Sequence, residues 1–200
     1  MKLDLKKFKI LGENFFSGDT AFVARELLGK FLVRIIDGAV SGGMIVETEA
    51  YYGEDDPASH AFRGATPRAG IMFGRAGIAY VYFCYGMYYL LNAVTEKEGK
   101  PGAVLIRAIE PLFGIENMSR RRKTENKINI SNGPGKLTAA LGITLKDNGR
   151  DFTDADSGLN ILDNINNFEI STSERVGISN GRDKFLRFFI KNNPYISYKR

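Results

Sequence analysis

The sequence has one cysteine and one histidine among its 200 residues. The single cysteine, Cys84, excludes a disulfide framework within the chain and is typical of a reducing compartment. With His60 as its only imidazole, one chain cannot build a zinc site from four thiolates, from paired thiolates and imidazoles, or from three imidazoles. Carboxylates could still bind magnesium or calcium.

A membrane span and a secretion signal are also missing. The first 16 residues mix Asp and Lys into apolar positions and so lack the core of a signal peptide. Residues 76–95 carry no charge, but they include five tyrosines and Gly86, which is too polar for a lipid-facing helix. We therefore expect two adjoining strands there, in a soluble cytoplasmic protein.

Composition and charge narrow the class of protein further. A hydrophobic content of 44% with 26% charged residues excludes a disordered chain. The formal net charge of +5 is compatible with a polyanionic partner without requiring one. No repeat or linker divides the sequence, so residues 1–200 are expected to form one domain with its own core.

The pattern along the chain predicts an α+β domain. Asp19 is expected to cap a helix that ends near Leu28, Pro111 to open a helix that reaches residues 120–123, and residues 135–141 to form a third. Strands are expected over residues 30–37, 44–52, 78–84, 88–94, 103–109 and 184–191. Residues 53–77 are turn-rich, and residues 147–167 are expected to be polar surface. Short strands with few crossover helices favour a curled, mostly antiparallel sheet with flanking helices and a protruding hairpin.

Two carboxylates stand out in the strand at 44–52. Glu47 and Glu49 share a face with Tyr51 in an otherwise apolar strand. They suit general acid–base catalysis, in which a partly desolvated carboxylate activates water, or else a surface or salt-bridged pair. His60 lies in the irregular loop, where it could be an acid, a base or a hydrogen-bond donor, or simply bond a backbone carbonyl.

The tyrosine-rich stretch is interpreted as a β-hairpin whose tip is Tyr85-Gly86-Met87. Tyrosines can stack on nucleobases, and an apolar side chain at a tip can wedge between base steps. The alternative is an aromatic ridge of the core, which suits Tyr80 and Tyr89 better than the tip. Cys84, inside the strand, is expected to be a core thiol.

Basic residues bracket these elements, and the run at 120–123 is interpreted as solvated surface. The stretch Gly133-Pro134-Gly135-Lys136 is not a phosphate-binding P-loop, because residues 130 and 137 are Ile and Leu where that motif needs Gly and Ser or Thr.

Several short motifs occur together in a fixed order. They are IVETEAY at 45–51, DPASH at 56–60, TPR at 66–68, YVY at 80–82, YGMY at 85–88, Asn92, VLIRA at 104–108, and RVG at 175–177. In this set the chain resembles the alkyladenine (3-methyladenine) DNA glycosylase family. The resemblance extends over nearly the whole chain, except residues 143–170. Ala69 departs from the pattern, since family members often have Asn there, which puts that loop's hydrogen bonding in question.

The resemblance implies roles for individual residues. Glu49 matches the general base that deprotonates the water attacking the sugar C1′, and Arg107 matches a residue that helps to place this water. The pocket for the flipped base is matched by Tyr51, His60, Tyr82 and Asn92, of which Asn92 disfavours guanine. Tyr85 matches the side chain that inserts into the duplex, with Met87 beside it, and the DNA-facing positions are Thr66, Arg68 and Lys136.

By the same resemblance, the chain is expected to be a bacterial, nucleoid-associated monomer that acts on double-stranded DNA and needs no metal or cofactor. It would flip out alkylated or deaminated purines (3-methyladenine, 7-methylguanine, hypoxanthine or ethenoadenine) and hydrolyse the N-glycosidic bond, which starts base-excision repair. No lysine occupies the catalytic place in the matched motifs, so strand cleavage is not expected. The alternatives are a non-catalytic nucleic-acid-binding module and a nucleosidase that acts on free small molecules.

Overall fold

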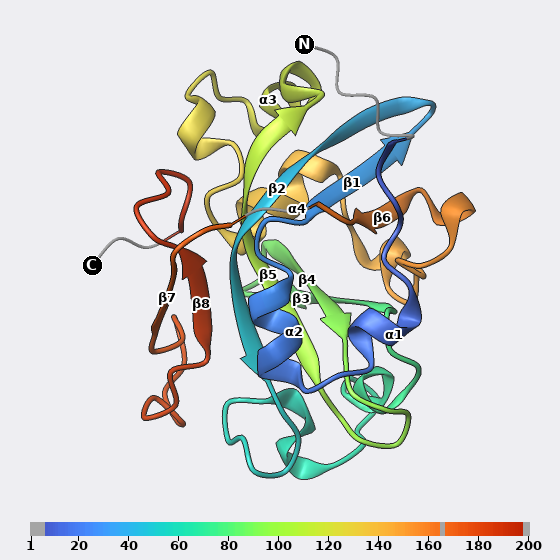
Figure 1. Cartoon of the computed structure of the whole chain (residues 1–200), viewed down its shortest axis with the longest axis vertical. Coiled ribbons are helices and arrows are strands. Elements are labelled where there is room, and N and C mark those ends of the chain that lie inside the picture. The colour runs from blue at the N-terminus through green and yellow to red at the C-terminus, as the bar shows by residue number, and fades with distance from the viewer. Residues whose placement is uncertain (1–6, 165–166, 198–200) are drawn as a thin grey trace.

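The computed structural model describes residues 7–164 and 167–197 (Figure 1). Its eight described strands form one open sheet in the order β3-β4-β5-β2-β1-β6, with β8 paired to β2 and β7 paired to β8. All the described pairings are antiparallel. The strands are β1 (Phe31–Ile36), β2 (Ala39–Tyr51), β3 (Ala79–Cys84), β4 (Tyr88–Val94), β5 (Ala103–Phe113), β6 (Leu159–Leu162), β7 (Ile170–Ser173) and β8 (Arg187–Ile190). The predicted α+β class and antiparallel sheet are confirmed.

The helices are short and pack against this sheet. The α-helices are α1 (Glu13–Phe16), α2 (Thr20–Glu26), α3 (Ile115–Arg122) and α4 (Pro134–Leu141). Single 3₁₀ turns lie at His60–Arg63, Gly70–Phe73, Lys127–Asn129, Leu145–Asp147 and Ala155–Ser157. The Asp19 carboxylate accepts a hydrogen bond from the Phe22 N–H and caps α2 as predicted. Within the described residues, no helix is long and apolar enough to cross a membrane.

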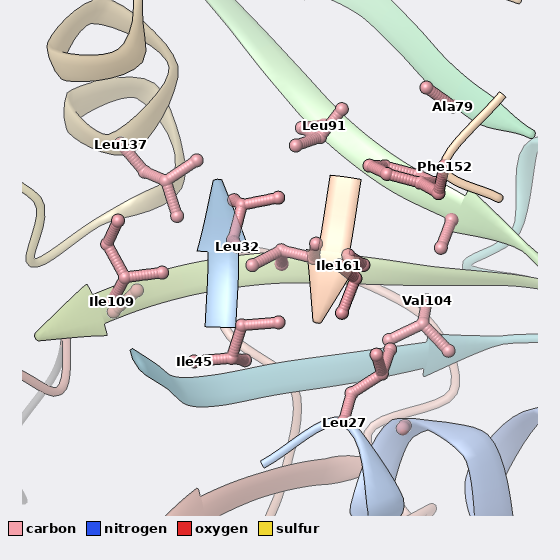
Figure 2. Close-up of a cluster of buried hydrophobic side chains, with 14 of the residues drawn as sticks. Leu27, Leu32, Ile45, Ala79, Leu91, Val104, Ile109, Leu137, Phe152 and Ile161 are labelled. Atoms are coloured by element: carbon pink, nitrogen blue, oxygen red, sulfur yellow. The ribbon is translucent and has the colours of Figure 1, made fainter. Parts of the chain in front are cut away.

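The main core lies between the sheet and the helices. Figure 2 shows side chains from β1, β2, β5 and β6 meeting Leu27, just after α2, and Leu137 of α4. All of these side chains are buried. Burial of this kind is the main force that fixes the helices on the sheet.

The long strand β2 is the centre of the sheet, because β1, β5 and β8 all pair with it. Its pairing with β5 shifts register between Gly42 and Gly43 and again on either side of Glu47, which marks bulges. A Cβ atom on Gly43 would overlap the Glu110 carbonyl oxygen of β5. Glycine at this position therefore allows β5 to lie close to β2.

The predicted helix start at Pro111 is wrong, since Pro111 lies within β5. It pairs with Gly43 next to a register shift, an irregular place where a ladder can accommodate a residue without an N–H. The helix α3 begins later, at Ile115, after Gly114 in the left-handed conformation.

The prediction of polar surface over 147–167 is only partly right, because Asn148, Asp154 and Asp156 are exposed but other residues are not. This segment contains buried Phe152 and the whole of β6, which is buried and pairs with β1. Its two buried polar side chains among the described residues have partners inside the fold: Asp147 pairs with Arg34 at 2.7 Å, and the Asn160 amide donates to the carbonyls of Phe152 and Asp154. The strand β7 was not predicted.

The basic run at 120–123 is only partly solvated surface. Arg121 donates to the Ala140 carbonyl of α4, and Arg122 donates to the Ile130 carbonyl. Both side chains are half-buried. Two of the four cations therefore hold α3 against its neighbours.

We expect Gly43→Ala to lower the free energy of unfolding by about 1–3 kcal/mol, because the new methyl group meets backbone rather than a movable side chain. Urea unfolding measures the change. Gly12→Ala is the control, since nothing lies within 4 Å of a Cβ atom there. Equal stability of both variants would contradict the close approach of β5 to β2.

Candidate active site

A cavity of about 320 Å³ opens beside β2, β3, β4 and β5. Loop residues 176–178 and the first residue of α4 complete its wall. The polar and aromatic lining consists of Tyr51, His60, Tyr80, Tyr82, Tyr85, Asn92 and Arg107. A mostly apolar cavity with a few convergent polar groups is the usual form of a small-ligand site.

Glu49 lies directly behind this wall and is fully buried. Its Oε2 accepts hydrogen bonds from the Tyr51 hydroxyl at 2.8 Å and from Arg107 Nη1 at 3.1 Å. Its Oε1 accepts a hydrogen bond of 2.7 Å from the backbone N–H of Val176. All three donors line the cavity, so the carboxylate is one hydrogen bond away from it.

Ionisation around Glu49 follows from burial and pairing. Burial, followed by the neighbouring Glu49 carboxylate, raises the pKa of Tyr51 well above its ordinary value, so the phenol stays protonated and donates. Burial lowers the pKa of Arg107, but the carboxylates of Glu49 and Glu47 outweigh it and the net pKa is raised. Arg107 is therefore a permanent cation in the cavity wall.

Glu47 is equally buried but lies deeper, outside the cavity lining. Its Oε1 accepts hydrogen bonds from Arg107 Nε at 2.9 Å and from Arg187 Nε at 2.7 Å. Burial raises the pKa of this carboxyl, and the two guanidinium groups more than reverse that effect, so the pKa is lowered. The two carboxylates are thus buried rather than solvated, and both are salt-bridged to Arg107.

The aromatic wall comes from β3 and the loop before it. His60 Nδ1 lies 2.8 Å from the Tyr80 hydroxyl, and its ring packs edge-on against Tyr82 with centroids 4.6 Å apart. Burial, and then the Arg68 charge, lowers the pKa of His60 to about 4. Asn92 of β4 is buried and donates to the Tyr80 carbonyl at 3.0 Å. The structure therefore brings together all four residues expected to line a base pocket.

The predicted hairpin is confirmed as β3 and β4, and its tip is exposed. Tyr85 has 77% of its surface exposed and Met87 has 66%. Tyr85 and Gly86 both have a positive φ, which is the geometry of a tight hairpin turn. The expectation that Cys84 is a core thiol is wrong: it is half-buried and lines the cavity, because it shares a strand face with Tyr80 and Tyr82.

Three residues are expected to face DNA: Thr66, Arg68 and Lys136. Thr66 and Arg68 lie in the loop that precedes the turn Gly70–Phe73, and Lys136 lies in α4. The Arg68 guanidinium lies 4.6 Å from the centre of the Tyr82 ring. Thr66 Oγ1 accepts the Ala69 N–H, so this loop keeps a hydrogen bond with alanine in the place of asparagine. Lys136 lies in the first turn of α4, whose Pro134 lines the cavity, and it donates to Asn132.

Sequence reasoning gave no role to Arg175, which holds the loop that carries Val176. Arg175 forms a paired salt bridge with Asp56 at 2.6 and 2.7 Å, and both side chains are buried. It also donates to the Ala50 carbonyl and lies 4.7 Å from the centre of the Tyr51 ring. Its place in the RVG motif was the only signal in the sequence, because Asp56 lies 119 residues away.

The chain matches one known protein family over most of its length. The family described as "Methylpurine-DNA glycosylase (MPG)" matches residues 14–194. A protein of Prosthecochloris aestuarii named "Putative 3-methyladenine DNA glycosylase" is 51% identical over 185 residues, which cover 92% of this chain and 89% of the relative. Proteins of the same name from Carboxydothermus hydrogenoformans and Francisella tularensis are 44% and 45% identical, over 95% and 90% of this chain and 100% and 94% of the relatives.

We predict that His60 stays uncharged across pH 5–8. As the only histidine of the chain, it gives a single set of imidazole proton signals in the untagged protein. These signals should titrate with a midpoint near pH 4. Arg68→Met should raise the midpoint by removing a nearby positive charge. A midpoint close to the ordinary 6.5 would contradict the buried placement of the ring.

The buried carboxylates predict a loss of stability in acid. The folded pKa values of Asp56 and Glu47 lie below their ordinary values of 3.8 and 4.5, so the unfolded chain takes up protons first as the pH falls. The two groups therefore add their full contribution to the free energy of unfolding above about pH 5. This contribution is lost as the pH falls through the lowered pKa values of the folded state. Urea unfolding between pH 7 and pH 3 should show this fall, and a flat profile would be inconsistent with it.

Removing the Asp56 charge tests the loop anchor directly. At pH 7, Asp56→Asn should lower the free energy of unfolding by about 3–5 kcal/mol, because buried Arg175 loses its counter-charge. In the same variant, the free energy of unfolding should also fall less between pH 7 and pH 3 than it does in the wild-type protein. Asp55→Asn is the matched control, since Asp55 is exposed.

Proposed function

The chain belongs to the methylpurine-DNA glycosylase family of N-glycosyl hydrolases, and we propose that it excises alkylated or deaminated purines from double-stranded DNA. The substrate class comprises 3-methyladenine, 7-methylguanine, hypoxanthine and ethenoadenine. The enzyme works as a monomer, with residues 1–200 as one catalytic domain, on nucleoid DNA in a bacterial cytoplasm.

The cavity supports recognition of a base that has left the duplex. A base inside a helix cannot reach a buried site, so it must be extruded at a cost of a few kcal/mol, which damage reduces. Tyr51 and Tyr82 offer aromatic surfaces for it, and neutral His60 offers its edge. Asn92 then disfavours guanine through a clash with the 2-amino group.

The exposed hairpin tip supports the extrusion itself. Tyr85 fills the gap that the extruded nucleotide leaves, and Met87 packs beside it, so stacking partly offsets the lost base stacking. Thr66, Arg68 and Lys136 bind the DNA backbone around the entrance. Electrostatic attraction from a chain with a net charge of +5 adds to this binding.

The observation that carries the proposal is a fully buried Glu49 held by three donors that line the cavity. Glu49 takes a proton from a water molecule, the water oxygen bonds to C1′, and the C1′–N bond breaks with its electron pair going to the base. The carboxylate also stabilises the positive charge that develops on the sugar. Arg107 orients Glu49 and the water.

The reaction ends at an abasic site. Of the described residues that line the cavity, none is a lysine, so an amine for a Schiff base is lacking there. A cationic alkylated purine leaves readily, whereas neutral hypoxanthine needs its ring protonated or hydrogen-bonded as it leaves.

Labelled duplexes that carry one lesion each test the proposal. The wild-type protein should convert at least one lesion to an abasic site that breaks only after alkali. Glu49→Gln should excise at least about a hundredfold more slowly, because the general base is lost, while it still binds the damaged duplex. Glu110→Gln is the matched control, since Glu110 lies on β5 outside the cavity lining.

Two outcomes would overturn this account. Excision by Glu49→Gln at the wild-type rate would remove Glu49 from the chemistry. Binding of every damaged duplex by folded wild-type protein without any abasic product would instead favour a nucleic-acid-binding module.

A further inference from the structure

A second layer of polar residues lies behind Glu49, and it centres on Arg107. The three nitrogen groups of this guanidinium each have a different acceptor. Nε donates to Glu47 at 2.9 Å, Nη1 donates to Glu49 at 3.1 Å, and Nη2 donates to the Ser197 hydroxyl at 3.1 Å. Arg107 is 6% exposed, so these bonds replace most of its contact with water.

Ser197 closes this layer from the C-terminal segment. Its hydroxyl accepts the bond from Arg107 and donates to Glu47 Oε1 at 2.8 Å. Its backbone N–H also donates to the second oxygen of Glu47. The Ser197 hydroxyl therefore bridges Arg107 and Glu47. It accepts a hydrogen bond from the arginine and donates one to the carboxylate.

The charges of this layer balance. Glu47 and Glu49 supply two negative charges, and Arg107 and Arg187 supply two positive charges, over four buried side chains. The guanidinium of arginine is planar and presents its donors in a rigid fork, so acceptors on its edges fix its orientation. Glu47 and Ser197 bind the two edges of Arg107 that face away from Glu49.

We infer that Glu47 and Ser197 are positioning residues for excision, which aim Nη1 of Arg107 at Glu49. This inference rests on the proposed function. Neither residue lines the cavity, so each acts on the substrate only through Arg107. The C-terminal segment thus supports the active site through Arg107, although it follows the last strand of the sheet.

The half-buried Ser197 allows a test in which the fold stays intact. Single-turnover excision by Ser197→Ala should be about tenfold slower than wild type, because Arg107 loses one of the three contacts that orient it. Its melting temperature and its affinity for damaged duplex should equal those of wild type. Ser197→Thr keeps the hydroxyl and should restore the rate.

Ser173→Ala is the matched control. The Ser173 hydroxyl accepts from Arg187, the other arginine on Glu47, and does not contact Arg107. This variant should excise at the wild-type rate.

The outcomes separate the inference from the proposed function. Excision by Ser197→Ala at the wild-type rate overturns the positioning role and leaves the proposed function standing. A lower melting temperature in proportion to the lower rate, with no rescue by threonine, also overturns it and assigns Ser197 to folding. Absence of excision by the wild-type protein overturns the proposed function, and the inference with it.

Discussion

The guanidinium of Arg107 between Glu47 and Glu49 is the interaction on which this site depends. Both carboxylates come from one strand and are fully buried, and two buried negative charges without a counter-charge would cost several kcal/mol each. The strand β5 supplies the cation because it lies against β2, where Gly43 permits close contact and a bulge at Glu47 adjusts the register. The pairing of β5 with β2 therefore places the counter-charge beside both carboxylates.

The same arrangement sets the electrostatics of the cavity. Burial keeps the pKa of Tyr51 and Tyr82 above that of an ordinary phenol and keeps His60 uncharged near neutral pH. Arg107 is a charged side chain that lines the cavity, and the Glu49 carboxylate, paired with it at 3.1 Å, compensates its charge. We propose that the positive charge that develops on the sugar is attracted to the Glu49 carboxylate, and that this attraction stabilises the transition state.

Local features of the fold could be predicted from the sequence, and distant pairings could not. The Asp19 cap, the hairpin and a helix at 135–141 (observed as Pro134–Leu141) were predicted because each depends on neighbouring residues. Pro111 was misassigned because a proline that suits the start of a helix also suits an irregular position in a strand. Burial within 147–167 was missed because the polar Asn160 is accommodated there by bonds to the backbone carbonyls of Phe152 and Asp154. The Ser197–Glu47 contact spans 150 residues, and no local pattern indicates it.

The central claim is that the carboxylate behind the cavity favours a positive sugar at C1′. The most direct test compares the affinity of the wild-type protein for two duplexes that differ at one position. One carries a protonated pyrrolidine in place of the sugar at an abasic site, and the other carries neutral tetrahydrofuran. We predict that the cationic duplex binds at least about tenfold more tightly, which corresponds to about 1.4 kcal/mol. Equal affinity for the two duplexes would contradict the claim.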